Sequence, residues 1–176
     1  MNRSVGLWQL MGFALTSLLG TILHFLYEWT GEAVLIAPFS GVNESTWEHM
    51  KLLFWPMLVF AFAQWIFFPD YADFWCVKLR GTIVGLVLIP IFFYTYNGVI
   101  GKSPDWINIA IFFISAAIAY IYETRRLNRE NEKCNHPKLA LALLCLIGVM
   151  FVLFTFRTPE IGIFKDPITG EFGIGN

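Results

Sequence analysis

The stretch "FSGVNESTWEHMKLLFWPMLVFAFAQWIFF", Phe39 to Phe68, places polar residues directly before a long apolar run. The run that follows Ser45 has the length of about 20 residues that a helix needs to cross a hydrocarbon layer roughly 30 Å thick. Its first two turns carry Glu48, His49 and Lys51, in a chain where charged residues are otherwise sparse. The stretch therefore predicts a membrane-spanning helix with polar groups gathered at one end.

Four further apolar runs have similar length, and the overall composition agrees with them. Of 176 residues, 57% are hydrophobic and only 14% are charged, whereas a soluble domain usually has about 25% charged residues. We therefore predict an all-α polytopic membrane protein with a bundle of five transmembrane helices in one domain, residues 1–156, and a polar extracytoplasmic tail, residues 157–176. The expected spans cover residues 5–28, 45–68, 80–101, 105–123 and 138–156.

The distribution of lysine and arginine predicts the orientation, because short cytoplasmic loops carry an excess of both. The link between the last two spans, "TRRLNRENEKCNHPK", contains five of them. If this link lies inside, the cytoplasmic side receives eight basic residues and the other side four, so we predict the N-terminus inside and the C-terminus outside. The eight are Arg3, Lys78, Arg80, Arg125, Arg126, Arg129, Lys133 and Lys138, and the four are Lys51, Lys102, Arg157 and Lys165.

Charge and cysteine content restrict the partners and the compartment. A net charge of −1 excludes a nucleic-acid partner, which requires a basic surface. Cys76, Cys134 and Cys145 are too few and too scattered for a disulfide framework, so we expect reduced thiols. Membrane lipids are the expected partners, and a homo-oligomer or a second membrane protein stays open.

Part of the polar cluster has a purely structural interpretation. Ser45 and Glu48 have the spacing of a capping box, in which both side chains satisfy free amides of the first helical turn. Glu44 suits the positive end of the helix dipole. Lys51 can reach outward to the membrane surface along its alkyl stem. This interpretation leaves the two histidines of the region unexplained.

Several polar residues are predicted to share one membrane level at the outer side. His24 and Glu28 are four residues apart near the end of the first span and so project from one helix face. The five-span topology brings them level with His49 and with further polar residues, whereas the inner halves of the spans offer little beyond Gln64. We therefore predict an outward-facing polar pocket, whose other members are Asn43, Glu44, Glu48, Lys51, Tyr94 and Asn97.

Two imidazoles with two or three carboxylates are a plausible set for a divalent metal with one open coordination position. In this hypothesis His24, Glu28 and His49 bind the metal, with zinc as the first choice. Glu48 or Glu44 is then the general base for a bound water. The reaction predicted is hydrolysis of a lipid or another amphiphile that reaches the pocket from the bilayer. The alternative is a non-enzymatic protein, either a small-solute or ion pathway component or a partner-binding membrane subunit.

The phrases "HFLYEWTGE", "FSGVNESTWEHMKLLFWPML" and "DPITGEFGIGN" resemble an uncharacterised family of small bacterial multi-pass membrane proteins, the domain of unknown function numbered 6512. The resemblance covers nearly the whole chain. It implies the bacterial cytoplasmic (inner) membrane but no activity, so it assigns no catalytic residue. The general arrangement is also similar to zinc-dependent membrane hydrolases such as alkaline ceramidases. This chain departs from those in span number and has only His24 and His49 where they use three histidines.

Overall fold

The computed structural model describes residues 3–67, 73–129 and 134–174, and its regular elements are helices. Five of them are long and apolar enough to cross a membrane, so the predicted all-α, five-span fold is confirmed. They are α1 (Arg3–Trp29), α2 (Thr46–Phe67), α3 (Phe74–Val99), α4 (Asp105–Leu127) and α5 (Pro137–Phe156), followed by a short 3-10 turn, η1 (Gly162–Phe164). Phe68 at the predicted end of span two, Lys133 in the basic link, and residues 1–2 and 175–176 lie outside the described residues.

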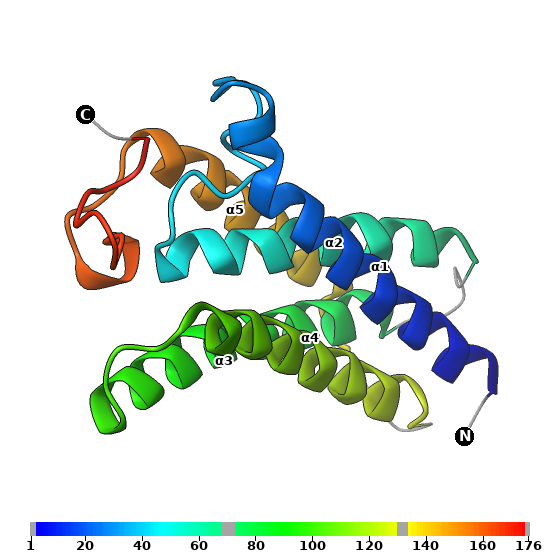
Figure 1. Cartoon of the computed structure of the whole chain (residues 1–176). Coiled ribbons are helices and arrows are strands. Elements are labelled where there is room, and N and C mark those ends of the chain that lie inside the picture. Colours follow the sequence, from blue (N-terminus) through cyan, green and yellow to red (C-terminus); the bar gives the residue numbers. More distant parts are fainter. Residues whose placement is uncertain (1–2, 68–72, 130–133, 175–176) are drawn as a thin grey trace.

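The helices form a bundle in which α1 packs against α2 and α4, and α3 packs against α2, α4 and α5. Figure 1 shows the start of α1 and the end of α5 at opposite ends of this bundle. Two glycines of α1 allow the neighbouring helices to approach closely, because they have no side chain. A Cβ at Gly12 would lie 2.4 Å from the Phe60 ring, and one at Gly20 would lie 2.5 Å from the Phe112 ring.

The start of α3 and the end of α4 hold a buried ion pair that corrects two predictions. Because α3 begins at Phe74 rather than near residue 80, Lys78 lies inside the helix and not in a loop. Its Nζ atom is 2.5 Å from Oε2 of Glu123, and both side chains are almost fully enclosed. This half of the bundle, which is the predicted inner half, is therefore not poor in polar groups, since buried Gln9 and Gln64 lie on α1 and α2 in addition to this pair.

Gly81 makes room for this pair. A Cβ at position 81 would lie 2.4 Å from Cγ and 2.5 Å from Oε1 of Glu123. The Lys78 ammonium group also lies over the rings of Phe60 and Phe74, each 5.5 Å away. Cation–π contact adds to the attraction of the carboxylate, so the lysine is held from several sides.

The expectation of reduced thiols is wrong for two of the three cysteines, because Cys76 and Cys134 form a disulfide. The Cys134 amide also donates to Oδ1 of Asp73, just before α3, at 2.5 Å. Spacing in sequence gave no sign of this link, which depends on the segment after α4 returning to the start of α3. Disulfides form in oxidising compartments, whereas the basic residues at this end of the bundle predict the cytoplasmic side. The two signals oppose each other.

The orientation predicts a labelling pattern. In a variant whose three native cysteines are replaced by alanine, a thiol introduced at Thr169 should react with an impermeant maleimide added to whole cells. A thiol at Asn128 should react only after lysis, because it lies at the end that carries the basic link. The reverse pattern would invert the topology and place the Cys76–Cys134 disulfide in the oxidising compartment.

The buried pair predicts a non-additive effect on stability. Lys78→Met leaves the Glu123 carboxylate without its cation and should lower the free energy of unfolding by about 3 to 5 kcal/mol. The double variant Lys78→Met/Glu123→Leu should recover most of this loss, since no unpaired charge stays buried. Unfolding in mixed micelles measures both, with exposed Lys102→Met as the control. A Lys78→Met protein as stable as the parent would show that the pair is dispensable.

Candidate functional site: a histidine and carboxylate cluster

The segment between α1 and α2 turns back along the last turns of α1. Gly31 and Glu32 adopt positive φ angles of 66° and 61°, and this reverses the chain. The Gly41 amide then donates to the carbonyl of Leu23 at 3.2 Å, and the Ser40 hydroxyl accepts from the Tyr27 amide at 2.9 Å. This return brings residues 41–44 beside His24, although they are far from it in sequence.

The start of α2 is capped, but not by the full predicted box. Ser45 acts as expected, because its Oγ accepts from the Glu48 amide at 3.4 Å and its carbonyl accepts from the His49 amide at 3.2 Å. The Ser45 amide, however, is bound at 2.9 Å by Oδ1 of Asn43 rather than by the Glu48 carboxylate. The capping box therefore explains Ser45 and not Glu48.

The Glu48 carboxylate is used in a buried ion pair with Lys51. Its Oε2 also accepts from the Val42 amide at 3.1 Å. Lys51 is fully buried and donates to the carbonyl of Ala37 at 2.8 Å and to Oγ1 of Thr155 at 3.2 Å. The predicted outward reach of Lys51 is therefore wrong: its ammonium group ties α2 to the returning segment and to α5.

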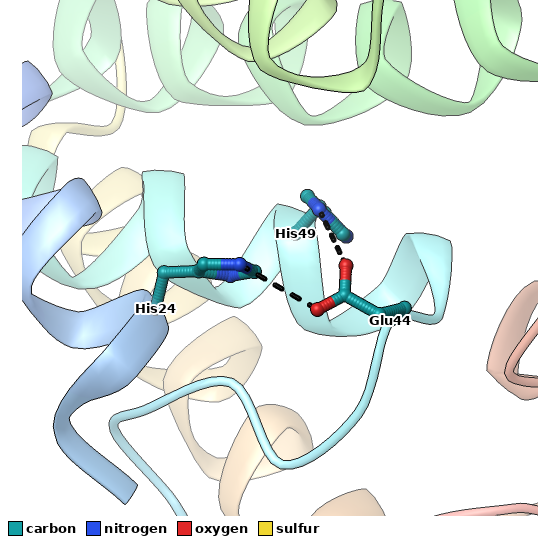
Figure 2. Close-up of side chains that lie close together, drawn as sticks. All are labelled: His24, Glu44 and His49. Atoms are coloured by element: carbon teal, nitrogen blue, oxygen red, sulfur yellow. Dashed lines mark ion pairs between the residues drawn. The ribbon is translucent and has the colours of Figure 1, made fainter. Parts of the chain in front are cut away.

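Three side chains from separate segments converge beside this pair. Glu44 extends from the returning segment between the imidazoles of His24 on α1 and His49 on α2 (Figure 2). Its Oε1 is 3.5 Å from Nε2 of His24, and its Oε2 is 3.6 Å from Nε2 of His49. One nitrogen or oxygen from each residue lies within 4.8 Å of the others, so the three can reach a common metal ion.

A hydrogen bond to the backbone indicates which nitrogen of the neutral His49 ring carries the proton. Its Nδ1 lies 3.0 Å from the carbonyl of Ser45, and a carbonyl only accepts, so Nδ1 carries the proton in the neutral ring. Nε2, the atom that faces Glu44, then has the free lone pair. Histidines that bind metals commonly donate their other ring nitrogen to a carbonyl in this way.

Two neighbouring hollows meet at the histidines. The larger, about 410 Å³, has a mixed lining, in which Glu44, Asn97 and Asn108 lie among apolar side chains such as Phe25 and Phe93, and it is called the polar hollow below because it carries the charged and amide groups. The smaller, about 220 Å³, is almost wholly apolar and lies between α1, α2 and α4. His24 and His49 line both. The cluster thus sits at the border between a polar and an apolar space.

The other predicted pocket residues have varied positions. Glu28 is exposed on α1 and is not part of the three-residue group. Asn97 lines the polar hollow and accepts the Ser103 amide at 2.9 Å, which closes the α3–α4 turn. Tyr94 lines a separate hollow beside the C-terminal segment. Asn43 does not contact the cluster through its side chain, whose Oδ1 accepts from the Ser45 amide at 2.9 Å.

Sequence reasoning missed the C-terminal segment as part of this region. Pro167 and Ile168 line the polar hollow with the histidines, and the buried Asp166 accepts from the Glu44 amide at 3.4 Å. The turn-forming residues of "DPITGEFG" indicated irregular structure, but no local signal indicates where such a segment packs.

Five membrane-spanning helices with a polar cluster at one end define a multi-pass membrane protein. Residues 1–174 match the model of a family of unknown function (DUF6512), and the chain belongs to this family, as the resemblance implied. No curated protein and no solved structure matched this chain.

Proposed function

We propose that this protein is a divalent-metal-dependent hydrolase of the bacterial cytoplasmic membrane that acts on a lipid or another amphiphile. The observation that carries the proposal is the convergence of His24, His49 and Glu44 where a polar and an apolar hollow meet. An amphiphile has its cleavable bond at the same kind of border, between its head group and its chain.

The geometry is compatible with a zinc site of three protein ligands and one open position. Ligand bonds of about 2.1 Å in a tetrahedron place neighbouring ligand atoms about 3.4 Å apart. In the structure each imidazole faces a different oxygen of Glu44, at 3.5 Å and 3.6 Å, and one ligand atom from each residue lies within 4.8 Å of the others. A small turn of the Glu44 carboxylate would therefore bring one of its oxygens to a metal shared with both imidazoles. In this proposal Glu44 takes the ligand role that the sequence suggested for Glu28.

His24, His49 and one oxygen of Glu44 would hold the metal, which when bound would supply an activated water, because the pKa of water falls to about 7 on zinc. The other Glu44 oxygen would take the proton of the attacking water. Glu44 would then return this proton to the oxygen or nitrogen that leaves the cleaved ester or amide bond. Glu48 is not the base in this scheme, because its Oε2 already accepts from Val42 and Lys51.

The apolar hollow supports the choice of substrate class. Its walls are side chains such as Phe25, Leu52 and Phe112, next to Gly20. It lies between α1, α2 and α4, and in this proposal the hydrocarbon chain of the substrate enters it from the bilayer. The polar hollow, with Asn108 and Lys102 among its lining residues, would then receive the head group.

A non-enzymatic solute or ion pathway is the second candidate, and the inner polar groups favour it. Gln9, Gln64 and the Lys78–Glu123 pair are buried at the opposite end of the bundle. A pathway needs polar lining from one side of the membrane to the other. The two hollows at the histidines are not lined by these residues, which makes a one-sided site the better supported of the two.

The metal site predicts non-additive losses of bound zinc. Protein purified without chelator should hold near-stoichiometric zinc, and His24→Ala and His49→Ala should each lose most of it. The double variant should be little worse than either single variant, since one missing ligand already removes most of the binding. Glu28→Ala, one turn from His24 on the same helix, is the matched control and should keep its metal. Full zinc retention in both histidine variants would exclude the shared site.

The hydrolase proposal predicts metal-dependent turnover in nanodiscs. A fluorescent ester phospholipid and a fluorescent ceramide serve as probes of the two bond types, with zinc-loaded and chelator-treated protein compared. Glu44→Gln should abolish turnover, and Glu48→Gln should retain it, because the two carboxylates have different roles. Loss of turnover in Glu48→Gln, with metal and fold intact, would make Glu48 the base. Zinc-loaded protein inactive on both probes would favour the non-enzymatic alternative.

A further inference from the structure

The C-terminal segment, residues 162–173, packs against the first turn of α2. The Phe164 ring lies 4.6 Å from the Trp47 ring and 5.5 Å from the Phe154 ring, measured between centroids. Phe164 is buried, so this aromatic contact anchors the segment beside the loop that carries Glu44. The segment is therefore part of the folded bundle at this end.

Asp166 is the residue through which the segment contacts the cluster. Its side chain is buried, and its two carboxylate oxygens have separate partners. Oδ1 accepts from the amides of Ile168 and Thr169, at 2.7 Å and 3.3 Å, and so shapes its own turn. Oδ2 accepts from the amide of Glu44 at 3.4 Å.

A second hydrogen bond links the C-terminal segment to Asn43, the residue before Glu44. Nδ2 of Asn43 donates to the carbonyl of Gly173 at 3.0 Å. Gly173 has a φ of 62°, and a Cβ there would lie 2.2 Å from Oγ1 of Thr158, so only glycine fits this close approach. Asn43 and Glu44 are thus both hydrogen-bonded to residues of the C-terminal segment.

Glu44 needs such support more than the two histidines do. His24 and His49 project from α1 and α2, whose backbones are fixed by helical hydrogen bonds, whereas Glu44 lies in irregular chain before α2. Its side chain is also the most exposed of the three, at 39%. A carboxylate on an unsupported loop would have to be ordered when the metal binds, which weakens binding.

We propose that Asp166 is a positioning residue of the metal site: it holds the Glu44 backbone so that the carboxylate lies between the two imidazoles. This inference rests on the metal site of the proposed function. Changes to groups that orient metal ligands typically cost about 10-fold to 100-fold in affinity.

Asp166→Asn tests the inference sharply, because asparagine can keep one oxygen on the Ile168 and Thr169 amides while turning an NH₂ group toward the Glu44 amide. Full-length protein in detergent, freed of metal, is titrated with Zn²⁺ and with Co²⁺, whose absorption spectrum reports coordination geometry. We expect about 10-fold weaker binding and an altered Co²⁺ spectrum. Thr169→Ala, in the same turn but without a bond to the loop, is the control and should match the parent.

The outcomes separate the two proposals. A parent protein that binds neither ion overturns the proposed function together with this inference. A parent that binds, with Asp166→Asn equal to it, overturns the inference alone. Weaker binding with an unchanged Co²⁺ spectrum means that only the charge of Asp166 matters, which also overturns the positioning role. If Asp166→Asn is much less thermostable than Thr169→Ala, the same titration of Asn43→Ala decides, and unchanged binding there overturns the inference.

Discussion

The end of this bundle that holds the histidines depends on a lysine ammonium group enclosed at the start of α2. Burying a charge is costly unless partners replace the lost water, and Lys51 meets this requirement with Glu48, the Ala37 carbonyl and Thr155. These partners come from α2, from the segment after α1 and from α5. The same group therefore fixes three parts of the chain relative to one another.

The position of Glu44 follows from this arrangement. Glu48 holds the Val42 amide while Lys51 holds Ala37, so the segment between α1 and α2 is bound on both sides of Gly41, which itself reaches back to Leu23. Only a short length of chain then remains before α2 begins. Glu44 lies in that length, and its carboxylate faces the histidines of α1 and α2 (Figure 2).

The opposite end of the bundle repeats the principle with Lys78 and Glu123. A buried ion pair adds little net stability compared with well-packed apolar residues, yet removing one partner is costly. Such pairs therefore select an arrangement more than they strengthen it, and here the missing side chain of Gly81 permits the close approach of the Glu123 carboxylate to the backbone of α3. The two pairs fix the two ends, and the apolar middle of the bundle packs between them.

The sequence by itself determined the helical class, the five spans and the family, because the length of an apolar run is set by the thickness of the bilayer and needs no knowledge of neighbours. It also placed both histidines at the level of the polar hollow, since span ends follow from the same lengths. Tertiary structure decided which groups meet. The four-residue spacing put Glu28 on the face of His24, but Glu28 stayed exposed while the returning segment brought Glu44 between the rings. Lys51, Lys78 and Cys134 were misjudged for the same reason. Whether a charge is buried or a thiol is bonded depends on what another segment places beside it, and local sequence patterns do not carry that information.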